Sequence, residues 1–204
     1  MSSCIVEPHY LPSLAYFKLL SNFDTIVFDL EGKFIKQTYR NRCLVLLSNK
    51  VGQLIVPIQH KTLGSTFREV KIDYSENWNK IHWKSIESAY GKTPFFEHYA
   101  PFFEELYINP PEYLFEFLLG HMKLCFKFLG WKKELLLNVD SLLDINHVDL
   151  KNLVHSKKSE FTYSSDIYHQ AFGEGFLGNL SVVDALFNIG PEAGQLIKSS
   201  TIIL

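Results

Sequence analysis

The chain has 204 residues, enough to bury a core of its own, and 47% of them are hydrophobic while 21% are charged, as in a folded globular domain. A formal net charge of −2 leaves no broad basic surface, which argues against a nucleic-acid partner. Three widely spaced cysteines without a C-x-x-C pair argue against a disulfide framework or a zinc knuckle and predict reduced thiols. We expect one domain spanning residues 1–204.

The N-terminal stretch MSSCIVEPHYLPSLAYFKLL does not have the pattern of a signal peptide. It lacks a cationic start, an uninterrupted apolar core and a small-residue cleavage site. No apolar run approaches the ~20 residues of a membrane-spanning helix, because Glu116 interrupts YLFEFLLG and lysines follow it. We therefore expect a cytoplasmic protein without a membrane span.

The first third of the chain is predicted to be mostly β. The expected elements are a strand CIVE (4–7), a helix from Pro12 to Asn22, an apolar strand TIVFDL (25–30), a hairpin of CLVLL (43–47) and LIVPI (54–58), and a strand EVKIDY (69–74). The hairpin turn SNKVGQ contains Asn49 and Gly52, which tolerate positive φ. TIVFDL is too continuously apolar for a half-exposed strand.

The hydrophobic period becomes helical from Trp78 onward. The expected elements are a helix NWNKIHWKSIESAY (77–90), a short helical segment FFEHYAPFFEELY (95–107), a long apolar helix EYLFEFLLGHMKLCFKFLG (112–130), a strand ELLLNVD (134–140) and two short helices around Ser181 and Gly190. In the first helix one inward stripe is predicted: Trp78, Ile81, His82, Ser85, Ile86 and Ala89. The polar segment 141–167 has no clear pattern. The predicted class is α+β, with an N-terminal mixed β-sheet and hairpin, helices packed on it, and an all-helical C-terminal end.

The segment IKQTYRNRC gathers positive charge between two apolar runs. In an extended chain Lys36, Arg40 and Arg42 share one face, and in a helix Lys36 and Arg40 are neighbours at i,i+4. The planar fork of arginine suits the oxygens of a diphosphate or a carboxylate. The alternatives are a solvated strand face, or an arginine held for structural reasons by a loop carbonyl, by Asp29 or by Glu31. The candidate binding residues are Lys36, Gln37, Tyr39, Arg40, Asn41 and Arg42.

Two histidines are candidate general bases. His82 lies in the middle of the predicted apolar stripe, and His9 lies on a proline-flanked turn after the first strand. An imidazole with a pKa near 6.5 suits a general base. The alternatives are a hydrogen-bonded core histidine at position 82 and an ordinary surface histidine at position 9.

Other chemistry has weaker signals. Cys43 follows a cation and is a candidate acyl-transfer nucleophile, but a cysteine that begins an apolar strand usually serves packing. No zinc-ligand spacing occurs, so we expect no metal or cofactor, although Asp29, Glu31 and Asp184 leave a magnesium site open. GEGFLG has the letters of a dinucleotide-binding fingerprint without its strand and helix context, which predicts a glycine loop. Asp184 is interpreted as a helix-capping carboxylate, with a role beside the arginines as the alternative.

Four blocks of the sequence, in order, resemble the WbqC-like family. They are EPHYLPSLAYF, FIKQTYRNRCLVLLSNKVGQLIVPI, ENWNKIHWKSIESAYGKTPFFEHYAPFFEELY and YHQAFGEGFLGNLSVVDALFNIGPEA. In the first block Glu7, His9 and Ala15 stand where the common family pattern has Gln, a polar residue and Gly. The family tends to occur among bacterial genes for O-antigen and other surface polysaccharides, which implies a cytoplasmic step on an activated sugar.

The resemblance and the cationic segment together lead to two functional hypotheses. The first is an enzyme that modifies a nucleotide-activated amino sugar in O-antigen or lipopolysaccharide synthesis, with acyl or aminoacyl transfer as the candidate reaction. The second is a non-catalytic accessory that binds a partner enzyme of the same pathway. The expected small-molecule partner is a nucleotide sugar or another anion.

Overall fold

The computed structural model describes residues 2–48, 50–62, 64–137, 147–155, 161–173 and 175–203. The helices are α1 (Leu14–Leu20), α2 (Trp78–Tyr90), α3 (Phe96–Ile108), α4 (Leu114–Phe128), α5 (Val182–Ile189) and α6 (Glu192–Ser199), with short 3₁₀ turns η1 (His60–Thr62) and η2 (Phe67–Glu69). The strands are β1 (Ser3–Val6), β2 (Thr25–Phe28), β3 (Arg42–Leu46), β4 (Val51–Ile55), β5 (Glu134–Leu137), β6 (Val148–Asp149), β7 (Thr162–Ser164) and β8 (Thr201–Ile203). The α+β class is confirmed. Asn49 of the predicted turn and residues 138–140 of the last predicted strand lie outside the described residues.

The strands among the described residues form three separate sheets. The largest has the order β5-β2-β1-β6, and its strands are all parallel. The predicted hairpin exists, but its second strand spans Val51–Ile55 and not 54–58, so Gly52, predicted in the turn at a position of positive φ, is a strand residue paired with Val45. β3 and β4 form an antiparallel sheet of their own, so the parallel and antiparallel strands do not share one mixed sheet. All four residues of β2 are buried, as expected for a parallel strand covered on both faces.

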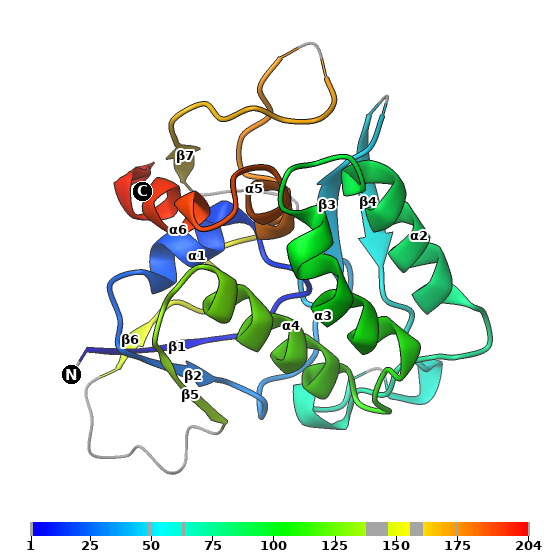
Figure 1. Cartoon of the computed structure of the whole chain (residues 1–204). Helices are drawn as coiled ribbons and strands as arrows, with labels where there is room; N and C mark the ends of the chain where they lie inside the picture. The colour runs from blue at the N-terminus through cyan, green and yellow to red at the C-terminus, as the bar shows by residue number, and fades with distance from the viewer. Residues whose placement is uncertain are drawn as a thin grey trace.

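The helices lie between and around these sheets. Figure 1 shows the parallel sheet at the lower left and the hairpin with α2 at the right, with α3, α4 and α5 between them. Aromatic rings join the layers: Phe17 of α1 contacts Phe126 of α4 edge-on, and Phe187 of α5 contacts both Phe96 and Phe103 of α3. One apolar core therefore connects the elements.

The predicted α2 helix is confirmed, and its stripe is confirmed in part. Trp78, His82, Ile86 and Ala89 are buried, but the Ile81 side chain is 58% exposed and faces outward. The predicted strand EVKIDY is wrong. Within this segment, Lys71 forms one isolated bridge with Tyr113, and Ile72 forms one isolated bridge with Ile58. Because Tyr113 and Ile58 belong to different segments of the chain, no continuous ladder forms.

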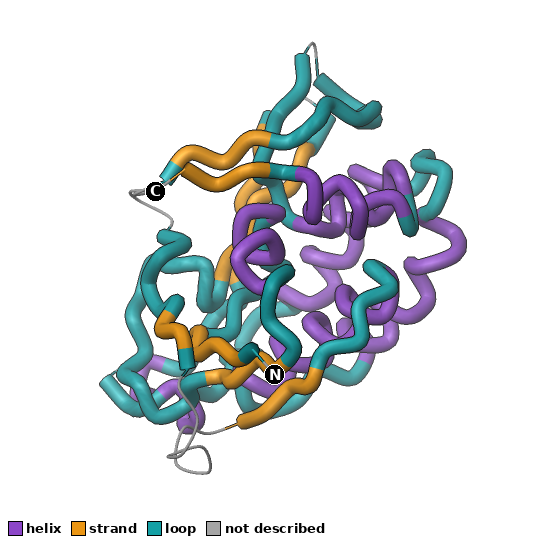
Figure 2. Tube along the Cα trace, turned by 90° about the vertical axis from the view of Figure 1, so that its left-hand side faces the viewer, coloured by secondary structure: helices purple, strands orange, loops and turns teal. Residues whose placement is uncertain are grey.

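The C-terminal helices begin and end where the sequence predicts. The Ser181 side chain accepts a hydrogen bond from the Val183 N–H at the start of α5, and Gly190, with φ of +57°, ends the helix. After α6 the chain forms β8, which pairs antiparallel with β7 (Figure 2). Backbone hydrogen bonds from Val182 to Pro12 and from Leu14 to Leu180 fix α5 against the start of α1.

Across the part of the chain that the structure describes, no helix combines the length and apolar character needed to cross a bilayer.

Candidate functional site

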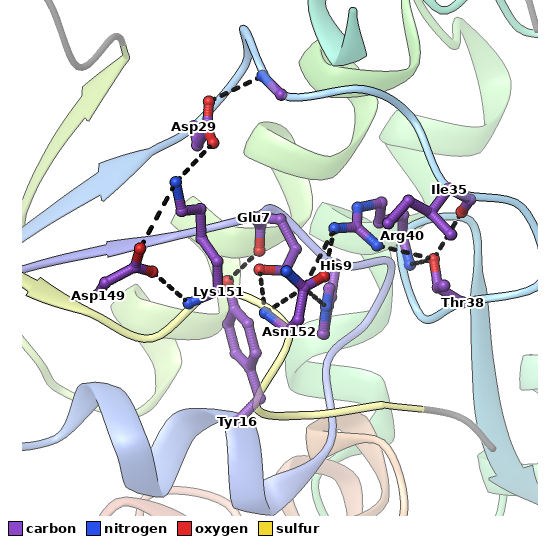
Figure 3. A network of polar contacts seen from close by, with 11 residues as sticks. Glu7, His9, Tyr16, Asp29, Ile35, Thr38, Arg40, Asp149, Lys151 and Asn152 are labelled. Atoms are coloured by element: carbon purple, nitrogen blue, oxygen red, sulfur yellow. Dashed lines mark hydrogen bonds and ion pairs between the residues drawn. The ribbon is translucent and has the colours of Figure 1, made fainter. Parts of the chain in front are cut away.

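Three parallel strands end at one edge of the sheet and are each followed by polar residues. Glu7 follows β1, Asp29 follows β2, and Lys151 and Asn152 follow β6. β1 lies between β2 and β6, so the chain leaves β1 toward one neighbour and returns later on its other side. Ligands of open α/β sheets bind outside the carboxyl ends of strands where the strand order reverses in this way. Figure 3 shows these side chains meeting at that edge.

The Glu7 carboxylate is the buried centre of this group. The backbone N–H of Asn152 donates to both Oε1 and Oε2 at 3.1 Å, and Oε1 lies 3.5 Å from Arg40 Nη2 and from His9 Nε2. Burial opposes ionisation of Glu7, but the hydrogen bond and charge interactions with His9 and Arg40 outweigh it and lower its pKa to about 2. Glu7 is therefore a carboxylate at neutral pH.

Arg40 is held on several sides. Its Nη2 donates to Asn152 Oδ1 at 3.0 Å and its Nη1 to Thr38 Oγ1 at 3.4 Å, in addition to the ion pair with Glu7. The side chain is only 7% exposed, which excludes a solvated strand face. Neither carboxylate suggested by the sequence forms an ion pair with Arg40 among the described residues, although the charge of Asp29 acts on the guanidinium from a distance. Asp29 pairs with Lys151 at 3.2 Å, and Glu31 pairs with Arg68 at 2.8 Å.

The cationic segment is not a strand before Arg42, so its three cations do not lie in one row. Residues 36–41 form turns, with Gln37 at φ of +60°, and Arg42 is the first residue of β3. A residue at positive φ breaks the alternation of an extended chain. As a result Arg40 turns inward to Glu7, whereas Lys36 and Arg42 face a different pocket.

The first pocket, which we name the carboxyl-edge pocket, has a volume of about 260 Å³. It is lined by Glu7, Asp29, Gly32, Lys33, Ile35, Arg40, Phe67, Lys151 and Asn152. Charged side chains of both signs therefore share one small cavity.

The second pocket, which we name the cationic pocket, has a volume of about 190 Å³. It is lined by Phe34, Lys36, Gln37, Asn41, Arg42, Ile58 and His60. No carboxylate is among these residues. Arg42 Nε and Asn41 Oδ1 are buried and have no hydrogen-bond partner among the described residues, although Asn41 Nδ2 donates to the Val56 carbonyl at 2.8 Å. Four of the six predicted binding residues thus line one cavity.

The two predicted histidines lie apart from each other. His9 contacts Glu7 and packs against the rings of Tyr16 and Tyr39, at centroid distances of 4.6 and 5.8 Å. Burial lowers its pKa, which favours the neutral imidazole. His82 instead lies in the core, where its Nδ1 is 3.1 Å from the Tyr10 hydroxyl, and burial lowers its pKa to about 4. Neither ring, nor Tyr39, lines the two pockets.

The other chemical candidates are separated or inert. Cys43 is buried and unpaired, and burial raises the pKa of its thiol, which disfavours a nucleophilic thiolate. Within the described ranges no group of three His, Cys, Asp or Glu side chains is arranged to hold a metal ion. Asp29 and Asp184, considered for magnesium, belong to different networks.

Asp184 does not cap its helix, so that interpretation is wrong. Its Oδ2 accepts hydrogen bonds from the Tyr168 hydroxyl at 2.5 Å and from Gln170 Nε2 at 2.8 Å. Gln170 also bonds both backbone groups of Leu177. The buried carboxylate therefore fastens the loop between Tyr168 and Leu177 to α5, and the GEGFLG stretch is part of that loop, with Glu174 outside the described residues.

The sequence contained a signal for part of the carboxyl-edge pocket. Glu7 and Asp29 directly follow buried apolar strands, a position where parallel strands present functional side chains. Lys151 and Asn152 had no such signal, because they lie in the polar segment that showed no clear pattern.

The fold and these cavities define an α+β protein with a polar pocket at the carboxyl edge of a parallel sheet. A family model, the WbqC-like protein family, matches residues 7–159, and the chain belongs to that family. The chain is also similar to the uncharacterized protein Rv1507c of Mycobacterium tuberculosis, with 25% identity over 225 aligned positions that cover 95% of this chain and 96% of that protein. No solved structure matches the chain.

Proposed function

We propose that this protein is an enzyme that modifies a nucleotide-activated sugar during synthesis of a bacterial surface polysaccharide such as O-antigen. The association of the WbqC-like family with polysaccharide biosynthesis genes supports the pathway. The observation that carries the proposal is the cationic pocket, which is lined by Lys36, Arg42 and His60 and has no carboxylate among its lining residues. The proposed reaction is transfer of an acyl or aminoacyl group to an amino sugar.

The cationic pocket has the donors that a diphosphate requires. The planar guanidinium of Arg42 offers paired N–H groups to two phosphate oxygens, and the ammonium of Lys36 adds a second positive charge. The buried Arg42 Nε without a described partner is a donor that a ligand oxygen would satisfy. Gln37 and Asn41, which line the same pocket, are the proposed neutral contacts.

Of the two candidate bases, we assign the role to His9. Its imidazole is kept neutral by burial, and its Nε2 lies 3.5 Å from Oε1 of Glu7, which lines the carboxyl-edge pocket, so His9 is the candidate base nearer to a pocket. His82 has its Nδ1 committed to the Tyr10 hydroxyl within an aromatic core. We therefore interpret His82 as a structural residue.

The test is thermal unfolding of the purified protein with a panel of nucleotide sugars, free nucleotides and inorganic anions. A ligand at about 100 times its Kd stabilises the native state by about 2.7 kcal/mol, which for a chain of this size is a rise of about 5 to 10 °C. We expect such a rise with a nucleotide sugar, and its loss in a Lys36→Gln, Arg42→Gln double variant. Lys123→Gln, an exposed position on α4, is the control and should keep the full rise.

A flat response to every member of the panel would contradict the proposal. The alternative, an accessory that binds a pathway enzyme, would then be favoured by co-purification of that enzyme without small-molecule binding.

A further inference from the structure

We propose that the carboxyl-edge pocket is a subsite for a neutral polyhydroxylated ring, the sugar part of a ligand, with Glu7 as its main hydrogen-bond acceptor. This inference rests on the proposed function, because it places two parts of one nucleotide-sugar ligand in two pockets. The phosphates lie beside Lys36 and Arg42, and the sugar lies beside Glu7. The two pockets lie on the same chain segment, since Ile35 lines one and Lys36 the other.

The charges of the carboxyl-edge pocket compensate each other in pairs. Glu7 faces Arg40 at 3.5 Å, and Asp29 faces Lys151 at 3.2 Å. An anionic ligand would be repelled by the two carboxylates, and a cationic ligand by the arginine and the lysines. A hydroxyl group both donates and accepts hydrogen bonds, so a ring of hydroxyls matches carboxylate acceptors alternating with cationic donors.

The size of the pocket sets the size of the ligand. Pockets for drug-sized ligands span about 300–1,000 Å³. The carboxyl-edge pocket, at about 260 Å³, lies just below that range and suits a single ring, while a whole nucleotide sugar requires more space. The ring is thus the part of the proposed substrate that fits here.

The Glu7 carboxylate is fixed in place and retains capacity for a ligand. Oε1 faces Arg40, His9 and the Asn152 N–H, whereas among the described residues Oε2 receives only a share of that N–H. A carboxylate oxygen has two acceptor sites, so Oε2 can accept a ligand hydroxyl. Asn152 adopts a φ of +62°, a left-handed conformation that asparagine tolerates better than most residues, and its backbone N–H bonds Glu7.

The Lys151 side chain supplies a reachable donor at the rim. It is 33% exposed and bridges Asp29, which follows β2, and Asp149, which ends β6, the two strands on either side of β1 (Figure 3). A donor held between two carboxylates has a fixed position and still offers an N–H to a hydroxyl oxygen. The subsite therefore has an acceptor at its base and a donor at its opening.

The test uses free monosaccharides, which carry no phosphate and so do not depend on the cationic pocket. The backbone amide signals of Gly32 and Asn152 are followed by NMR during titration with neutral hexoses and N-acetylhexosamines, with glycine and inorganic phosphate as zwitterionic and anionic probes. We expect at least one sugar to move both signals, while glycine and phosphate leave them in place. Glu7→Gln should weaken that sugar at least tenfold, and Arg42→Gln should not change it.

Two results would overturn the inference: no sugar moves the two amide signals, or glycine or phosphate moves them instead. The same spectra show whether Glu7→Gln is folded. If it is not, Lys151→Gln replaces it, because that partly exposed side chain can be removed without emptying the interior, and unchanged sugar affinity in this variant would count against the subsite. A different result would contradict the proposed function: nucleotides would fail to bind at Lys36 and Arg42 while free sugars still bind.

Discussion

Arg40 and Glu7 form a buried ion pair that links the cationic segment to the parallel sheet. Removing one member of a buried pair leaves the other charge uncompensated, which costs about 3 kcal/mol or more. We predict that Arg40→Ala lowers the free energy of unfolding, measured in urea, by about that amount. Arg68→Ala, which breaks an exposed pair with Glu31, is the control and should cost less than about 1 kcal/mol. Equal costs for the two variants would contradict the buried network.

The lowered pKa of Glu7 predicts a pH dependence of stability. Because the folded-state pKa is about 2, below the ordinary value of 4.5, the stabilisation is fully present above about pH 4.5 and is lost as the pH falls toward 2. We expect the difference in unfolding free energy between wild type and Glu7→Gln to shrink between about pH 6 and pH 3. Burial raises the pKa of Asp184, so its contribution to stability changes with pH in the opposite direction. Asp184 is present in both proteins, and its contribution therefore cancels in the difference. A difference that does not vary with pH would refute the assignment.

At the scale of elements, one glutamine fastens the loop before α5. Gln170 donates to Asp184 and bonds both backbone groups of Leu177, so a single side chain closes the loop. We predict that Gln170→Ala speeds amide hydrogen exchange of Leu177 and limited proteolysis of the loop, since its backbone groups lose their partners. His169→Ala, an exposed position in the same loop, should leave both rates unchanged. Unchanged rates in the glutamine variant would show that other contacts hold the loop.

The elements that the sequence predicts correctly are those specified by local signals. The continuous apolar run of β2, the periodicity of α2, and the cap and glycine around α5 all act over a few residues. EVKIDY failed because alternation indicates a strand only where a partner is in register, and its partners, Ile58 and Tyr113, come from separate segments.

The candidate site was predictable only within one segment. Lys36 and Arg42 were found from composition, and they do share a pocket. The contacts of Arg40 with Glu7 and Asn152 join residues 33 and 112 positions apart and depend on β6 pairing with β1, which no local pattern indicates. The turn at Gln37, at positive φ, was likewise not marked by a glycine.

At the scale of the whole molecule, the C-terminal segment beyond the family match is bonded into the rest of the chain. Backbone hydrogen bonds join Ser181 to Leu44 in the hairpin and Val182 to Pro12 before α1. We propose one domain, and we predict a single unfolding transition in calorimetry, with equal calorimetric and van't Hoff enthalpies. Two resolved transitions would show that the C-terminal helices form a separate unit.

The proposed function depends most on where a phosphate binds, so the most direct measurement is a crystal structure of the protein soaked with a nucleoside diphosphate sugar at saturating concentration. We predict that the diphosphate lies between Lys36, Arg42 and His60, with a phosphate oxygen bonded to the Arg42 guanidinium. A nucleotide bound elsewhere, or an empty cationic pocket under those conditions, would contradict it.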